Sequence, residues 1–206
     1  MRFRALGAAV AVVLAVAGLA GCRTNVGTAA WVDGHRITDS DVKELVTPTG
    51  IDPSLAAQAA AQHQQIQPPK SQVLTFLIQE AVYEDTLAAE NVKYTEGKLT
   101  SVHDAAISEF FQGTLSGTAF ENKLAQRLPK FGIDSSFIAK LVRVAELKYL
   151  LHVNNQNTPL NTLIERAKIS VTVSPRYGTW EPKSLAVNPK APVPGYLSVQ
   201  PGGPAG

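Results

Sequence analysis

The segment that decides the fold is residues 30–42, which read Ala30-Trp31-Val32-Asp33-Gly34-His35-Arg36-Ile37-Thr38-Asp39-Ser40-Asp41-Val42. Asp-Gly pairs favour two-residue hairpin turns, because both central residues then adopt positive φ. We therefore expect two short strands around Asp33 and Gly34. Thr38 and Asp41 have the spacing of a helix capping box, and Asp39 lies in the first turn, where the helix dipole favours negative charge. Each aspartate of the segment thus has a structural role available.

His35 is the residue of this segment that could have a catalytic or ligand-binding role instead of a purely structural one. With Asp33, Asp39 and Asp41 it could form a ligand or catalytic set, although a side chain beside a hairpin turn is usually solvated. The other histidines, at positions 63, 103 and 152, are widely spaced. The sequence has no HExxH, CxxC, GxSxG or phosphate-loop motif. We expect no catalytic residue, no metal site and no cofactor, and we interpret the protein as a non-enzyme.

The rest of the folded region predicts helices and one returning strand. Asp52 and Pro53 are suited to the cap and first turn of a helix, and apolar residues recur at helical spacing further on. The expected helices are 54–65, 70–90, 100–111, 120–128, 135–152 and 160–166. Residues 169–173 alternate apolar and polar side chains, as a half-buried strand does.

A lone hairpin is marginal in water, whereas three strands packed on a helix are viable. We therefore expect residues 169–173 to pair with the opening hairpin, which places Val32 and Val171 in one sheet. The predicted fold is mainly α, a helical domain with a small antiparallel sheet that joins the N- and C-terminal strands.

Two features of the helical region leave alternatives open. Phe110, Phe111, Phe120, Phe131 and Phe137 could belong to the core, or they could line a groove for apolar polypeptide segments. The helix at 54–65 consists largely of alanine and glutamine and should be exposed. It could be a flap or partner surface, or simply a tolerated insertion.

The N-terminus predicts export and anchoring. Arg2 and Arg4 precede the apolar run from Leu6 to Ala20, which is short for a bilayer-spanning helix and typical of a signal peptide. The next residues, Leu19-Ala20-Gly21-Cys22, resemble a bacterial lipobox, in which cleavage between Gly21 and Cys22 leaves a lipidated N-terminal cysteine. Cys22 is the only cysteine, so no intramolecular disulfide is possible. The alternative is an uncleaved short anchor with an incidental cysteine.

Lipidation would also fix the compartment. A diacylglyceryl group supplies the two chains that stable anchoring requires. We therefore expect a 1–21 signal peptide, a 22–27 linker and an extracytoplasmic protein held at the outer face of the cell membrane through its lipid.

Charge and composition limit the partners and the domain boundaries. Removing residues 1–21 takes two arginines from the chain's 19 basic residues and leaves 17, equal to its 17 acidic residues. The mature chain therefore has no global basic excess for nucleic acid. Residues 181–206 hold six prolines and four glycines, which predicts a disordered tail. One domain, residues 28–180, remains.

Five segments, taken in order, resemble a family of extracytoplasmic chaperones. The opening AWVDGHRITDSDVKEL is similar to the start of the N-terminal domain of SurA and PrsA. SQVLTFLIQEAVYEDTLAAENVKYTEGKL looks like the family's next helix and loop, although residues 91–96 lack the usual Gly-Ile. FGIDSSFIAKLVRVAELKYLL resembles the family's long helix, and 169–173 resembles its returning strand. The start of the tail, SPRYGTW, resembles that of actinobacterial lipoproteins with this domain.

The resemblance implies a polypeptide-binding function, and the length of the chain argues against prolyl-isomerase activity. It implies binding of unfolded or nascent exported polypeptides, with Phe110, Phe111, Phe120 and Phe137 as candidate client contacts. In SurA and PrsA a parvulin prolyl-isomerase domain lies between the long helix and the closing strand, whereas here residues 153–163 are too few for a domain. The expected protein is a chaperone without isomerase activity. The alternative is an adaptor or accessory lipoprotein for one cell-envelope partner.

Overall fold

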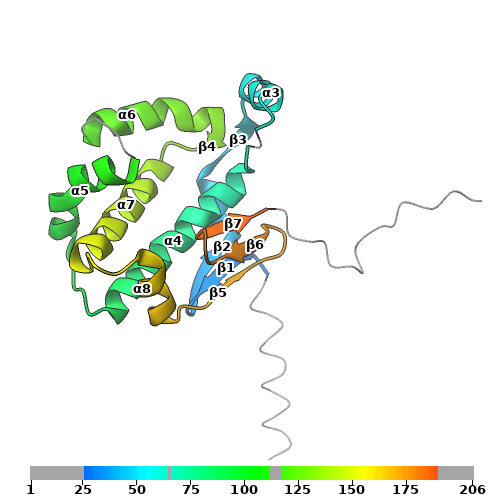
Figure 1. Ribbon diagram of the computed structural model, residues 1–206. Helices are drawn as coiled ribbons and strands as arrows, with labels where there is room; N and C mark the ends of the chain where they lie inside the picture. Colours follow the sequence, from blue (N-terminus) through cyan, green and yellow to red (C-terminus); the bar gives the residue numbers. More distant parts are fainter. Residues whose placement is uncertain (1–25, 65, 112–116, 190–206) are drawn as a thin grey trace, which may run out of the picture.

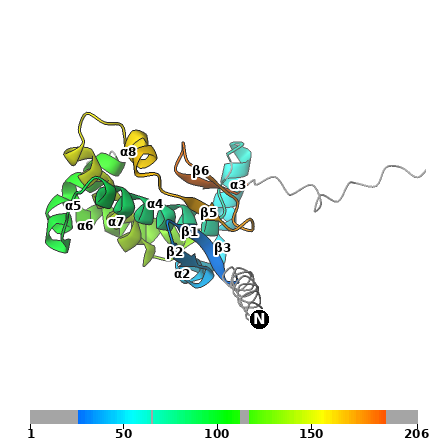
Figure 2. The same cartoon turned by 90° about the horizontal axis from the view of Figure 1, so that it is seen from below.

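The computed structural model describes residues 26–64, 66–111 and 117–189. Its helices are α2 (Asp39–Glu44), α3 (Pro53–Ala61), α4 (Pro69–Ala89), α5 (Glu96–Phe111), α6 (Gly117–Arg127), the 3-10 turn η1 (Leu128–Lys130), α7 (Phe137–Asn154) and α8 (Leu160–Ala167). Its strands are β1 (Thr28–Val32), β2 (His35–Thr38), β3 (Val46–Ile51), β4 (Phe131–Ile133), β5 (Val171–Val173), β6 (Thr179–Glu181) and β7 (Ala186–Asn188). Helices α5, α6 and α7 lie on one side of α4, and the strands lie on the other together with α2 and α3 (Figures 1 and 2).

The two ends of the domain meet in a three-stranded antiparallel sheet with the order β2-β1-β5. Asp33 and Gly34 form the hairpin turn with φ values of 42° and 91°, as the Asp-Gly signal predicts. In the second pairing Val32 lies opposite Val171. The prediction of a mainly α fold whose small sheet joins the terminal strands is therefore confirmed.

Helix α2 begins with the capping box that the sequence predicts. The Thr38 hydroxyl accepts a hydrogen bond from the Asp41 amide at 3.2 Å, and the Asp41 carboxylate accepts one from the Thr38 amide at 2.7 Å. Asp39 accepts hydrogen bonds from Arg176 and from the Tyr177 hydroxyl, and so joins the start of α2 to the chain that follows β5. The three aspartates of the opening segment thus form the turn, the cap and a cross-link.

Helix α4 is the central element of the core. It packs against α7 on one side and against the sheets on the other (Figures 1 and 2). Ten of its 21 residues are buried, among them Leu74 and Ile78, which are fully inaccessible. Burial of one such side chain contributes about 1.5–3 kcal/mol. Even the hydroxyls of Thr75 and Thr86 are buried, and each donates to a backbone carbonyl one turn earlier.

The domain extends further than the sequence predicts. Strands β6 and β7 form a hairpin, so the predicted boundary at residue 180 and the disorder predicted from residue 181 are wrong as far as residue 189. Leu185 and Val187 are buried against α4. The backbone amide of Val187 donates a hydrogen bond to Thr75 Oγ1 at 2.9 Å. The side-chain amide of Gln79 donates one to the Leu185 carbonyl at 2.7 Å. These contacts offset the ordering entropy of a short, proline-flanked segment. Residues 190–206 lie outside the described part of the chain.

A second strand pairing, between β3 and β4, was also not predicted from the sequence. Residues 46–51 contain a proline and a glycine, and β4 has only three residues. The strands touch closely at Gly132, where φ is 74° and a Cβ would lie 2.7 Å from the Gly50 carbonyl carbon. Glycine therefore permits this approach of two backbones. The pair fixes the chain just before α3, which projects from the body with none of its residues buried (Figure 1).

Candidate functional site

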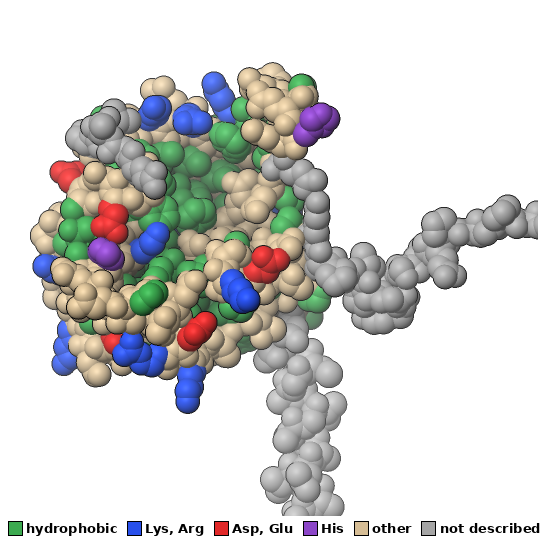
Figure 3. Space-filling model, in the orientation of Figure 1, with side chains coloured by type: hydrophobic (Ala, Val, Ile, Leu, Met, Phe, Trp, Pro, Cys, Tyr) green, Lys and Arg blue, Asp and Glu red, His purple; other side chains and the backbone are tan. Residues whose placement is uncertain are grey.

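An apolar hollow marks one face of the molecule. In Figure 3 hydrophobic side chains gather in a depression over α4 and α7, below α6. The surrounding elements carry half-buried apolar side chains: Phe76 on α4, Leu124 on α6, Phe131 on β4 and Ile138 on α7. A cavity of about 380 Å³ lies between Ile66, which precedes α4, Phe76 on α4 and Phe131 on β4. Such a surface can bind apolar side chains of a polypeptide by shape and burial.

Three of the four predicted client-contact residues form an aromatic cluster where α5 meets α6. The ring centroids of Phe110 and Phe111 are 4.7 Å apart, and those of Phe111 and Phe120 are 4.2 Å apart. The Lys148 ammonium lies 4.6 Å from the Phe110 centroid. All three phenylalanines are half-buried. The cluster therefore joins the two helices and leaves part of each ring exposed.

The fourth residue, Phe137, is wrong as a client contact. It is 1% exposed and packs edge-on against Phe76, with centroids 5.6 Å apart. Its position at the start of α7 points it into the core, which the apolar spacing alone could not distinguish from a groove position. Phe76, which lines the cavity beside Phe131, was not among the predicted contacts.

Polar contacts connect α6 to the rest of the domain. His103 on α5 lies 3.0 Å from the Glu146 carboxylate of α7 through Nδ1, and 3.6 Å from the Glu121 carboxylate of α6 through Nε2. Glu146 is 7% exposed, so its partner matters for the stability of the buried charge. The Asp104 carboxylate accepts a hydrogen bond from the Gly117 amide at the first residue of α6. Sequence reasoning missed this set because its members come from three separate helices.

A second polar cluster ties α4, α5 and α7 together. Arg143 donates to Glu96 at 2.8 Å and to Glu84 at 3.0 Å, and its guanidinium lies 5.6 Å from the centroid of Tyr94. Although burial disfavours its charge, the hydrogen bonds to the two carboxylates raise the pKa of Arg143 above its ordinary value. Burial raises the pKa of Tyr94 as well. These groups hold the helices that form the floor of the hollow.

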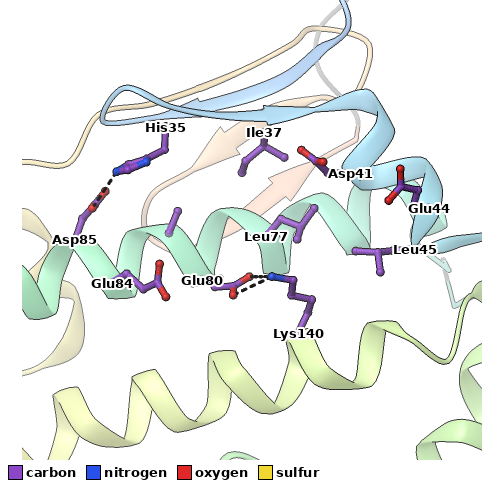
Figure 4. A pocket seen from close by; sticks show the side chains of 11 residues that line it. His35, Ile37, Asp41, Glu44, Leu45, Leu77, Glu80, Glu84, Asp85 and Lys140 are labelled. Carbon is purple, nitrogen blue, oxygen red and sulfur yellow. Dashed lines mark hydrogen bonds and ion pairs between the residues drawn. The ribbon is translucent and has the colours of Figure 1, made fainter. Parts of the chain in front are cut away.

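His35 lies at the edge of a separate acidic cleft of about 450 Å³ between the hairpin and α4 (Figure 4). Its lining combines carboxylates with an apolar floor: Asp41, Glu44, Glu80, Glu84 and Asp85 around Ile37, Leu45, Leu77 and Ala81. His35 is 71% exposed and lies 3.8 Å from Asp85, while Lys140 pairs with Glu80 at 3.0 Å. The alternative ligand set of His35 with Asp33, Asp39 and Asp41 does not form. Asp39 pairs with Arg176, and Asp41 caps α2.

Asp85 on α4 is a partly buried carboxyl of this cleft. Burial raises its pKa, and the attraction of His35 opposes the rise. Its Oδ2 atom is buried and has no hydrogen-bond partner among the described residues. The cleft can attract a cationic side chain, but its lining contains no hydroxyl or thiol nucleophile among the residues that the structure describes.

The remaining predicted site residues are those of the predicted signal peptide and lipid anchor. The predicted signal peptide 1–21, the predicted cleavage position at Gly21 and the predicted lipidation site Cys22 lie outside the described residues. Within residues 26–189, excepting the gaps at 65 and 112–116, no helix has the length and hydrophobicity needed to span a bilayer. The same part of the chain contains no group of three or more His, Cys, Asp or Glu placed to hold a metal ion.

The fold and the hollow define a class in structural terms: a helical domain clasped at its two ends, with an apolar hollow on one face. No protein-family model, curated protein or solved structure matches this chain.

Proposed function

We propose that this protein is a lipid-anchored extracytoplasmic chaperone that binds unfolded or nascent exported polypeptides, without prolyl-isomerase activity. The apolar hollow between α4, α6 and α7 is the observation that carries the proposal (Figure 3). A contiguous apolar depression with a polar rim is typical of a protein or peptide interaction site. Dispersed apolar contacts suit clients that share no sequence, because burial is non-directional.

The sequence supports the same proposal independently. The lipobox-like segment ending at Cys22 supports export and anchoring where exported chains emerge, and the order of segments resembles the N-terminal domain of SurA and PrsA. The closed β2-β1-β5 sheet is compatible with that resemblance. The proposal assigns binding, and no covalent chemistry, to the hollow.

Suppression of aggregation tests the proposal. A secreted enzyme unfolded in urea is diluted into buffer with the mature chain, and light scattering follows its aggregation. Leu124→Gln and Phe131→Gln should weaken the protection about tenfold, because each places an amide in the apolar surface. Ile164→Gln on α8 is the matched control, since Ile164 is likewise half-buried but lies on another helix. Absence of protection by the unmodified chain, or equal loss in the control, would contradict the proposal.

An adaptor for one cell-envelope partner is the second candidate, and α3 favours it. This helix projects from the body and has no buried residue, yet it is capped by Asp52, whose carboxylate accepts from Ser54 at 2.8 Å. A well-formed helix without a packing partner is suited to bind another protein. Photocrosslinkers at Ala57 and Leu124 in living cells separate the two functions. One stoichiometric product from Ala57 supports an adaptor, whereas many products from Leu124 support a chaperone.

A further inference from the structure

Four basic side chains gather where the described chain begins. Arg36 on β2 donates to the Val26 carbonyl at 2.8 Å, and Arg176 donates to the Thr28 carbonyl at 2.9 Å. Arg176 also lines a cavity of about 310 Å³ together with Lys43 of α2 and Lys70 of α4. Arg36 and Arg176 thus contact the first described residues, and Lys43 and Lys70 share a cavity with Arg176.

This positive charge is only partly neutralised. Arg176 pairs with Asp39, whereas Arg36, Lys43 and Lys70 have no carboxylate partner among the described residues. None of the undescribed residues is aspartate or glutamate, so the sequence contains no further acid that could neutralise them. The patch retains a net positive charge in a mature chain whose overall balance is zero, and this asymmetry is what an anionic surface can select.

The position of the patch relates it to the anchor. Cys22 is four residues before Val26, and four extended residues span at most about 14 Å. A lipid on Cys22 would thus hold Val26, which is 83% exposed, close to the headgroup layer. Helices α5 and α6 lie at the opposite end of the molecule from β2 and α2 (Figure 2).

We propose that Arg36, Lys43, Lys70 and Arg176 form a docking surface for anionic phospholipid headgroups, which orients the anchored domain on its membrane. The anchor supplies attachment, and the patch selects the face that lies on the bilayer. The α5–α6 end is thereby directed away from the membrane, where polypeptides are accessible. This inference rests on the lipid anchor of the proposed function and is independent of client binding.

The test replaces the biological anchor with a chemical one. The mature chain from Cys22 is coupled through this single thiol to N-tetradecylmaleimide, and partitioning is measured on vesicles of phosphatidylcholine with and without 40 mol% phosphatidylglycerol, where the percentage is roughly that of a strongly anionic leaflet. One acyl chain gives only marginal, reversible binding, so added electrostatic attraction is measurable. Each basic residue near an anionic surface should change partitioning about fivefold.

The Lys43→Ala/Lys70→Ala variant should therefore lose about 25-fold in partitioning to the anionic vesicles and be unchanged on phosphatidylcholine. Lys98→Ala/Lys123→Ala, on α5 and α6, removes the same charge and should have little effect. Raising the salt to 0.5 M should abolish the difference between the two vesicle types, because charges are then screened. Equal losses in both double variants, or no preference for anionic vesicles by the unmodified chain, would overturn the proposal. Because the anchor is attached chemically, neither failed lipidation in cells nor failed client binding affects the result.

Discussion

The clasp end and the arm end of this domain are built by different interactions. The clasp end comprises the β2-β1-β5 sheet and the face of α4 beneath it, where backbone pairing and fully buried side chains predominate. The arm end comprises α5 and α6. Of the eleven residues of α6, only Gly117 is buried, and the ring contact of Phe120 with Phe111 and polar contacts to His103 and Asp104 hold the helix in place. The hollow therefore has one firmly packed wall, formed by α4, and one wall, formed by α6, that can adjust at modest cost.

The largest effect should come from a cavity in the firmly packed wall. Leu74 is fully buried in α4, and Leu74→Ala should lower the free energy of unfolding by about 3 kcal/mol through lost burial and the residual cavity. Leu124→Ala on α6 removes the same atoms from a half-buried position and should cost less than about 1 kcal/mol. Urea denaturation measures both. Similar costs for the two variants would refute the distinction between the ends.

Loss of the histidine that connects three helices should have the next largest effect. His103→Ala leaves the buried Glu146 carboxylate without its 3.0 Å partner and should cost about 2 kcal/mol. Amide hydrogen exchange should accelerate in α5 and α6 but not in β1. Glu121→Gln is the control, because its carboxylate is farther from His103 and more exposed, and it should change exchange little. Acceleration spread evenly over the domain would show that the arm is not a separate unit.

Removing the capping box at the clasp end should have a smaller effect on the free energy of unfolding. Thr38→Ala removes the hydroxyl that accepts from the Asp41 amide and should cost about 1 kcal/mol. Thr38→Ser retains the oxygen and should recover most of that loss. Thermal denaturation of the three chains checks the order. Equal destabilisation by alanine and serine would mean that the threonine methyl, rather than the cap, matters.

The sequence predicted the clasp better than the arm, and the reason is physical. The Asp33-Gly34 turn, the Thr38 cap and the alternation in residues 169–173 are local signals, so the sheet that contains Val32 and Val171 followed from them. The β6–β7 hairpin was missed because its stability comes from contacts with α4 more than 100 residues earlier. His103 and Glu146, 43 residues apart, meet only after α5 packs on α7. Burial of Phe137 depended equally on tertiary packing, so spacing alone misassigned it to the candidate site.

The smallest effect concerns Asp85, which lies on α4 where the hairpin meets the acidic cleft. Burial raises its pKa above the ordinary value of about 4. Between the ordinary and the raised pKa the folded chain binds more protons than the unfolded chain, so this group makes stability fall as pH rises through that window. Above the window the penalty is fully present. Asp85→Asn should therefore stabilise the protein slightly at pH 7, and the difference should vanish below about pH 4. Denaturation midpoints measured from pH 3.5 to 7 check the sign. Destabilisation by asparagine at pH 7 would instead mean that attraction to His35, 3.8 Å away, outweighs the desolvation of the carboxylate, and that the clasp end depends on charge as the arm end does.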